Sequence, residues 1–152
     1  MFTIHADISI ASEIASIMDK FRTQFNHLVI CINNAAVAPH TALLNELVEV
    51  REKIYAVNCS ETFLMPQAAA RLMIDRGRGG RVINFSSIVS QNGSPGTAAY
   101  ASSRAAVEAF SRVVVIELSP YYILVNTIRP DIIDTQPKPL PEHMEKSFRT
   151  RI

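Results

Sequence analysis

Three short runs of apolar residues divide the chain, and none of them alternates with polar residues. They cover residues 27–32 (HLVICI), 81–85 (RVINF) and 123–128 (ILVNTI). Continuous runs of this kind, rich in β-branched residues, are typical of strands buried on both faces of a parallel sheet. Residues 2–6 (FTIHA) are a weaker candidate for a strand at the beginning of the chain.

Helical periodicity fills the segments between these runs. In the first segment, five apolar residues fall on one helical face: Ile14, Ile17, Met18, Phe21 and Phe25. A second helix is predicted from about residue 43 to about residue 75, with a break near Asn58. A third begins near Ala98 and ends at Pro120, because proline does not continue a helix. The order β-α-β-α-β-α-β predicts an α/β fold with a parallel sheet and right-handed crossovers.

Composition and charge exclude several classes of function. With 152 residues, 48% of them hydrophobic, the chain is long enough for one domain with a core. Its net charge of +1, without a basic block, favours neither nucleic acid nor an anionic membrane as a partner. No apolar run approaches the roughly 18 residues of a spanning helix, and we see no signal peptide. The two cysteines lie in apolar segments, which indicates a reducing, cytoplasmic location. The histidines lack metal-ligand spacing, so we expect no metal site.

Polar residues follow the apolar runs at the points where the strands should end. Ser86 and Ser87 follow the second run, and Asn33 and Asn34 follow the first. Ligands of parallel α/β sheets bind beyond the carboxyl ends of the strands, so we expect a site there. The alternative for the asparagines is a turn in which their side chains tie two strand ends together.

The next helix contributes a phenol and a cation. Tyr100 stands near its beginning and Arg104 lies one turn later, so both face the same side. A phenol ordinarily titrates near pH 10, and a nearby positive charge helps it to act as a base at neutral pH. Together with the Ser87 hydroxyl, these groups predict a proton-transfer site. The alternative is a capping serine and a tyrosine at an interface.

The segment from Arg81 to Arg104 resembles the active-site stretch of the short-chain dehydrogenase/reductase family. The separation of Ser87 and Tyr100 is that of the family. Residues 33–36 (NNAA) resemble its N-N-A-G motif, and residues 126–135 (NTIRPDIIDT) resemble N-x-x-x-P-G-x-I/V-x-T, with Asp131 in place of glycine. The resemblance implies a partial Rossmann-like, doubly wound parallel sheet, NAD or NADP as cofactor, and interconversion of an alcohol and a carbonyl.

The resemblance also implies roles for individual residues. Tyr100 would be the acid/base, Ser87 would orient the substrate, and Asn58 would hold a relay water. Arg104 stands where the family has lysine. Arginine keeps the positive charge, but it is planar, longer and effectively never deprotonated, so the exchange is not conservative.

Cofactor contacts are implied for eight residues: Asp7, Asn33, Ala35, Tyr100, Arg104, Pro130, Ile133 and Thr135. Within this set, Asp7 would contact the adenine, and the Ile133 backbone would hold the carboxamide. A single aspartate before a helix is, however, more often a cap or turn residue. The choice between NAD and NADP is not readable from the chain.

The family's glycine-rich loop after the first strand has no counterpart in the sequence. The only glycine cluster, residues 77–80 (GRGG), precedes a strand and is better explained as a helix stop. We therefore expect a chain truncated at both ends, without the first two strands and that loop. Residues 1–135 would form the truncated NAD(P)-binding domain and residues 136–152 a proline-rich, charged tail.

Three hypotheses remain open for the function. The first is an NAD(P)-dependent oxidoreductase acting on a small-molecule alcohol or carbonyl. The second is a catalytically inactive binding or oligomerisation module on the same scaffold, and the third is an incomplete gene product. In the family, helices corresponding to residues 43–75 and 98–120 pack across a subunit interface, so we expect a homo-oligomer, with neither nucleic acid nor a membrane as partner.

Overall fold

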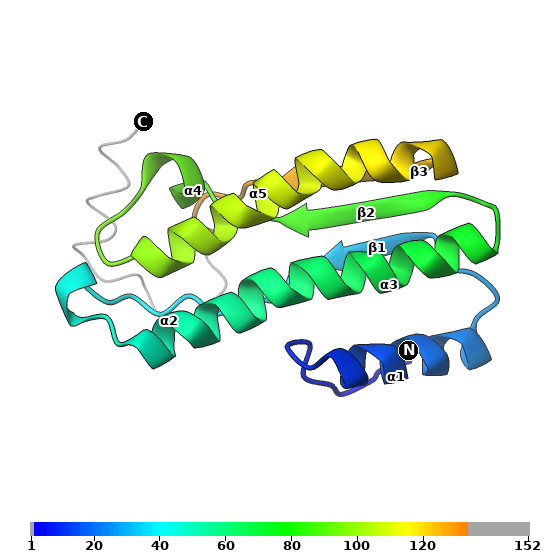
Figure 1. Cartoon of the computed structure of the whole chain (residues 1–152), viewed down its shortest axis with the longest axis horizontal. Helices are drawn as coiled ribbons and strands as arrows, with labels where there is room; N and C mark the ends of the chain where they lie inside the picture. The colour runs from blue at the N-terminus through cyan, green and yellow to red at the C-terminus, as the bar shows by residue number, and fades with distance from the viewer. Residues whose placement is uncertain (1, 134–152) are drawn as a thin grey trace.

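A three-stranded parallel sheet forms one layer of the molecule (Figure 1), in a computed structural model that describes residues 2–133. The strands are β1 (Ile30–Asn33), β2 (Gly80–Phe85) and β3 (Ile123–Ile128), in the order β1-β2-β3. Both neighbouring pairs are parallel. The predicted α/β class with a parallel sheet is confirmed. The predicted tail from residue 136 and the site residue Thr135 lie outside the described residues.

The predicted helices form, and the second is interrupted where the sequence indicates. Val48–Tyr55 (α2) and Glu61–Asp75 (α3) are joined by a π-helical turn, Ala56–Ser60, which contains Asn58. Residues 43–45 form a separate 3₁₀ turn, so the helix begins later than predicted. The remaining helices are α1 (Ala11–Gln24), α4 (Val89–Asn92) and α5 (Ala98–Leu118), and a 3₁₀ turn with Pro120 follows α5.

The larger helices cover one face of the sheet. Figure 1 shows α3 and α5 lying along the strands, with α1 beside α3. Inward-facing side chains of all three strands pack against α3 in one core, which contains Cys31, Val82, Ile123, Val125, Ala69, Ala70 and Met73. On the opposite face, Ile30, Ile32 and Leu124 are about half exposed. Burial on both faces was predicted, but no element within residues 2–133 packs on that second face.

The predicted strand at residues 2–6 is not formed, so this prediction is wrong. A strand exists only through a ladder of hydrogen bonds to a neighbour, and the sheet of the described residues ends at β1. The Phe2 ring instead packs edge-to-face on Phe25, with 5.6 Å between the ring centroids.

A chain of buried polar side chains ties two strands to α5. Asn33 and Asn84 are neighbours in the register, and Asn33 Nδ2 donates to Asn84 Oδ1 at 2.6 Å. Asn84 Nδ2 donates to Ser111 Oγ at 2.8 Å, and Ser111 Oγ donates to the Val107 carbonyl. Asn84 is fully buried, so these bonds satisfy groups that would otherwise be costly to bury. The alternative offered for Asn33, a tie between strand ends, is the one its side chain adopts.

None of the helices in the described part of the chain is both long enough and apolar enough to cross a membrane.

Replacing Asn84 by alanine should destabilise the fold. The change leaves Asn33 Nδ2 without its acceptor and Ser111 Oγ without its donor, at a cost of about 2–3 kcal/mol. The matched control is Asn126→Ala, because Asn126 is an exposed asparagine on β3 and its loss should cost less than about 0.5 kcal/mol. Urea unfolding followed by circular dichroism measures both, and equal losses would contradict the role given to the buried chain.

Candidate active site

Arg104 lies where the strands end, and its guanidinium faces inward. The residue is 2% exposed. Its Nη1 donates to the Phe85 carbonyl, at the end of β2, at 2.9 Å, and Nη2 makes a long 3.5 Å contact with the Ala35 carbonyl beyond β1. Its Cζ is 5.5 Å from the centroid of the Tyr100 ring, within the range of a cation–π interaction. The two residues predicted to cooperate are therefore in contact.

Glu61 is a buried carboxyl group beside this arginine. It is 4% exposed, and among the described residues Glu61 Oε2 and Arg104 Nε are the buried side-chain atoms without a hydrogen-bond partner. Burial raises the pKa of Glu61 to about 7, although the Arg104 charge and the Ala35 amide act in the opposite direction. Sequence reasoning missed this residue. The available signal was a glutamate within an otherwise uncharged helical stretch, residues 56–65.

Asn58 joins the segment after β1 to α5. Its side chain is fully buried in the π turn, and its Oδ1 accepts a hydrogen bond from the Val37 amide at 2.9 Å. Its Nδ2 donates to the Val37 carbonyl and to Ser103 Oγ, both at 3.0 Å. Ser103 precedes Arg104, so Asn58 fixes the helix that carries the tyrosine and the arginine. Single π turns occur frequently at functional sites.

Ser87 lies in the loop that follows β2, next to the exit of β3. It is partly buried, and its Oγ is 3.4 Å from the Val89 amide. The flanking backbone is bound to the end of β3, because the Ser86 amide donates to Ile128 O at 2.8 Å and the Ile88 amide to Pro130 O at 3.0 Å. The loop of the predicted substrate-orienting serine is thus attached to the segment that contains Pro130.

The residues predicted to contact a cofactor differ in how accessible they are and in whether their polar groups are already hydrogen-bonded. Ala35 is exposed, and Ile133 is 64% exposed. Pro130 is partly buried, and its carbonyl accepts from Ile88. The Asn33 side chain is turned inward to Asn84, which leaves its backbone as the group that could face a ligand.

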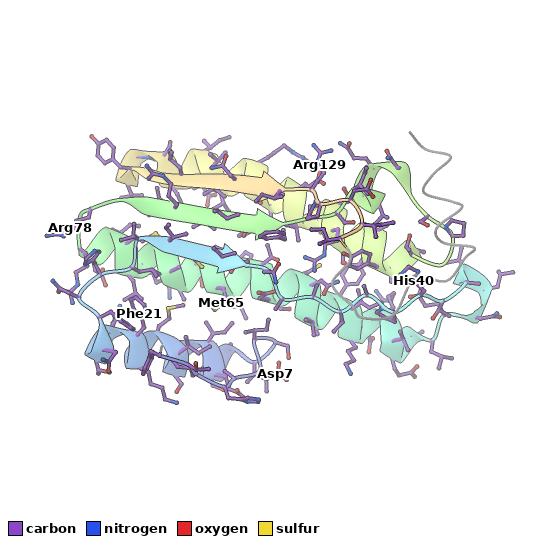
Figure 2. The ribbon with its side chains drawn as sticks, turned by 180° about the vertical axis from the view of Figure 1, so that it is seen from behind. Asp7, Phe21, His40, Met65, Arg78 and Arg129 are labelled. Atoms are coloured by element: carbon purple, nitrogen blue, oxygen red, sulfur yellow. The ribbon has the colours of Figure 1, made fainter. Side chains whose placement is uncertain are left out.

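Asp7 forms a turn at the beginning of α1, on the side where β1 ends (Figure 2). Its Oδ1 accepts from the Ser9 amide at 2.9 Å and from Ser9 Oγ at 2.7 Å, and its own amide donates to Glu13 Oε2 at 2.6 Å. The hydrogen bonds from Ser9 hold the pKa of Asp7 below its usual value. The carboxylate therefore adopts the turn role that was the alternative for this residue.

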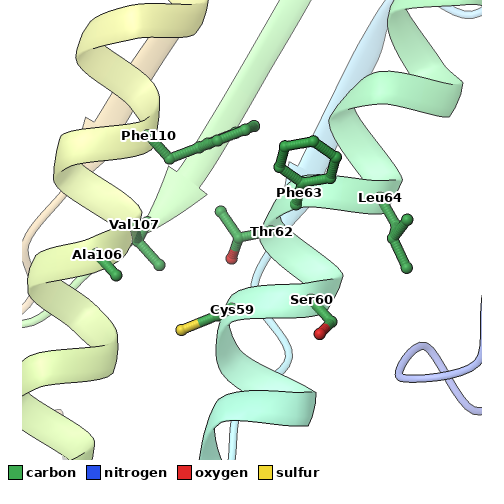
Figure 3. Close-up of a pocket in the computed structure, with 8 residues that line it drawn as sticks. All are labelled: Cys59, Ser60, Thr62, Phe63, Leu64, Ala106, Val107 and Phe110. Atoms are coloured by element: carbon green, nitrogen blue, oxygen red, sulfur yellow. The ribbon is translucent and has the colours of Figure 1, made fainter.

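A pocket of about 410 Å³ lies elsewhere, between α3 and α5 (Figure 3). Its lining is mostly apolar and contains none of the predicted site residues: Cys59, Ser60, Thr62, Phe63, Leu64, Ala106, Val107 and Phe110. Phe63 is half exposed, and its ring centroid is 5.5 Å from that of Phe110. Within residues 2–133, no group of three or more histidine, cysteine, aspartate or glutamate residues could hold a metal ion.

Comparison with known proteins gives consistent matches. The family described as short chain dehydrogenase matches residues 1–144. A carbonyl reductase (NADPH) 2 of Sus scrofa is 38% identical over 104 residues, which cover 68% of this chain and 43% of that protein. A short-chain type dehydrogenase/reductase of Picea abies is 35% identical over 132 residues, covering 86% of this chain and 48% of that protein.

Solved structures show the same relationship. The crystal structure of a gluconate 5-dehydrogenase from Burkholderia cenocepacia, in complex with NADP and tartrate, has a TM-score of 0.81 and 27% identity. It is matched over 86% of this chain and 51% of that one. A short-chain type dehydrogenase/reductase from Mycobacterium marinum has a TM-score of 0.79 at 30% identity, over 84% and 52%. The chain spans about half the length of the relatives that it matches.

Burial of Glu61 should make the stability of the protein depend on pH. Its pKa is about 7 in the folded state and near the ordinary 4.5 in the unfolded state, so between these values the folded state binds more protons. The free energy of unfolding should therefore fall as the pH rises from 4.5 to 7, by on the order of 3 kcal/mol. Glu61→Gln should remove this fall, as urea unfolding at pH 5 and pH 8 would show. The control is Glu117→Gln, because Glu117 is an exposed glutamate on α5, and this variant should retain the fall. A fall that persists in Glu61→Gln would refute the assignment.

Proposed function

The chain belongs to the short-chain dehydrogenase family, and from this membership we propose that it acts in the NAD(P)-dependent interconversion of an alcohol and a carbonyl compound. The observation that carries the proposal is the Arg104 guanidinium over the Tyr100 ring, at 5.5 Å, where the strands end. The neighbouring loop supplies the Ser87 hydroxyl. The carbonyl reductase and the gluconate dehydrogenase among the similar proteins support the reaction class.

The proposed chemistry divides the reaction between a hydride and a proton. When bound, a nicotinamide cofactor would provide hydride chemistry at the carbonyl carbon, in either direction. Tyr100 gives the substrate oxygen its proton and becomes a phenolate, while Ser87 Oγ donates a hydrogen bond to the same oxygen and orients it. The charge of Arg104 stabilises the phenolate. Positive charge and a positioned hydroxyl act most strongly where developing charge is shielded from water.

The residues at the strand ends fit the nicotinamide half of such a cofactor. Ala35 and Ala36 are exposed and small, so a ligand can approach the backbone beyond β1. Pro130 and Ile133 would supply backbone beyond β3. Arg104 contributes its charge, while its Nη1 is already bound to the Phe85 carbonyl. We assign no residue to the diphosphate, because the glycine cluster of the described residues, at 77–80, leads into β2 and does not follow a strand.

A catalytically inactive binding module is the second candidate, and the burial of Arg104 favours it. A cation that is 2% exposed and bound to a strand-end carbonyl stabilises the scaffold whether or not a substrate binds. In this case Tyr100 and Ser87 would be remnants of the family's site. The two candidates differ in whether the chain binds a nicotinamide cofactor.

We propose a second copy of this chain as the protein partner. The pocket of Figure 3 continues along α3 and α5 into a depression of about 260 Å³, and both are lined by Phe63 and Phe110. Val113 and Ile116 on α5 are 54% and 74% exposed. In a two-fold symmetric dimer the same patch serves both subunits, so this groove would pair with its own copy.

A charge in the groove should prevent this association. Phe63→Glu would place a carboxylate within the apolar contact and should weaken dimerisation roughly a hundredfold, about 3 kcal/mol. The control is Leu44→Glu, because Leu44 is 96% exposed and lies outside the groove. Sedimentation velocity between 1 and 100 µM measures the association. Identical dimerisation of Phe63→Glu and the parent would contradict the interface, and so would a monomeric parent.

The enzymatic proposal predicts opposite effects for two substitutions in the contact pair. Tyr100→Phe removes the proton donor and should abolish NADPH- or NADH-dependent carbonyl reduction, while folding is retained. Arg104→Lys should raise the rate, because a lysine ammonium is compact and its three donors rotate freely. Cofactor binding is followed by the change in NADH or NADPH fluorescence. Absence of saturable binding at millimolar cofactor would exclude the enzyme and favour the inactive module.

A further inference from the structure

Glu108 brings three segments of the chain together on one carboxylate oxygen. It lies on α5, one helical turn after Arg104. Its Oε1 accepts hydrogen bonds from Ser86 Oγ at 2.7 Å and from Ser90 Oγ at 2.6 Å. The Nε of Arg129, just after β3, is 3.6 Å from the same oxygen. A helix, the loop after β2 and the exit of β3 therefore meet at this side chain.

The carboxylate is a strong and persistent acceptor. Burial tends to raise the pKa of Glu108, but the hydrogen bonds from Ser90 and Ser86 and the charge of Arg129 outweigh it, so the pKa is lowered and the group stays ionised at neutral pH. Charge-assisted bonds of this kind are shorter and stronger than bonds between neutral groups.

Each serine has one proton and more than one acceptor within reach. Ser86 Oγ is 3.0 Å from the Arg104 carbonyl, and Ser90 Oγ is 2.7 Å from the Ser87 carbonyl. Each hydroxyl is also within hydrogen-bond distance of Glu108 Oε1, at 2.7 Å for Ser86 and 2.6 Å for Ser90, so its proton is shared between the carboxylate and the carbonyl. Each hydroxyl therefore links Glu108 to a backbone carbonyl, that of Arg104 for Ser86 and that of Ser87 for Ser90. The two anchored serines stand on either side of Ser87.

We propose that Glu108 is a positioning residue for Ser87: it anchors the loop on both sides of that serine and couples the loop, through Arg129, to the segment beyond β3. Because it concerns the orientation of the substrate by Ser87, this inference rests on the proposed function. The backbone provides the second half of the connection, since the Ile88 amide donates to the Pro130 carbonyl. Glu108 touches neither substrate nor cofactor and acts through the serines.

The first test measures the loop without any reaction. Amide hydrogen exchange by NMR is compared for the parent, Glu108→Ala and Glu108→Gln, with Glu117→Gln on the same helix as control. We expect exchange at Ile88 to accelerate roughly tenfold or more in Glu108→Ala, and less in Glu108→Gln, which keeps an oxygen at the same place. Exchange at Val82, in the core of β2, should not change. Equal acceleration at Ile88 and Val82 would show only a loss of global stability. No acceleration at Ile88 would show that Glu108 does not anchor the loop. Either result overturns the proposal.

The second test uses turnover of the full chain with NADPH or NADH and a carbonyl substrate. Glu108→Ala should lower kcat roughly tenfold and leave the KM for the cofactor within about twofold. Glu108→Gln should lower kcat less than Glu108→Ala does. Ser86→Ala/Ser90→Ala should match Glu108→Ala, and the triple variant should lose no more, because the three act as one unit. An unchanged kcat overturns the proposal.

The two tests separate this inference from the proposed function. If the parent has no turnover but Glu108→Ala accelerates exchange at Ile88 and not at Val82, the anchored loop stands and the enzymatic proposal fails. If the parent reduces the carbonyl substrate and the Glu108 variants change neither kcat nor exchange at Ile88, the enzymatic proposal stands and the positioning role fails.

Discussion

The contact on which the site depends is the buried guanidinium of Arg104 against the carbonyls at the strand ends. A cation removed from water needs acceptors, and strand ends supply carbonyls without a ladder partner. The bond to Phe85 O fixes α5 against the end of β2, and the contact with Ala35 O adds the segment beyond β1. This placement holds the guanidinium over the Tyr100 ring. It also explains the pKa of Glu61. Burial disfavours the ionised carboxylate and raises the pKa, while the Arg104 charge favours the ionised form and acts in the opposite direction.

The other polar contacts of the site follow the same principle. Asn58 reaches from the π turn to the Val37 backbone, and Glu108 reaches from α5 to the loop after β2. In each case a helix side chain binds a segment that follows a strand, beyond β1 for Asn58 and beyond β2 for Glu108. The strand ends therefore set the position of the site, and contacts from helix side chains fix the segments that surround it. The same arrangement leaves the Ala35 region exposed, at the place where a ligand would approach.

Local patterns predicted the elements that depend on local physics. The run at residues 123–128 is β3 residue for residue, and Pro120 ends α5 as expected, because hydrophobic periodicity and proline act within a few residues. The family separation of Ser87 and Tyr100 predicted a site where the strands end, and the Arg104–Tyr100 pair and the Ser87 loop lie there. The prediction failed at residues 2–6, because a strand needs a neighbour that composition does not reveal. Glu61 was missed because a glutamate in a helix is normally solvated, and its burial arises only when α3 packs beside Arg104.

The orientation of Arg104 is the central claim, and NMR of its side chain tests it most directly. In a ¹⁵N-labelled sample, with Arg104→Lys used to assign the signals, the account predicts guanidinium protons that exchange slowly with water, because the group is 2% exposed and bound to Phe85 O. Fast exchange, equal to that of an exposed arginine such as Arg51, would contradict the account and would place the guanidinium in solvent.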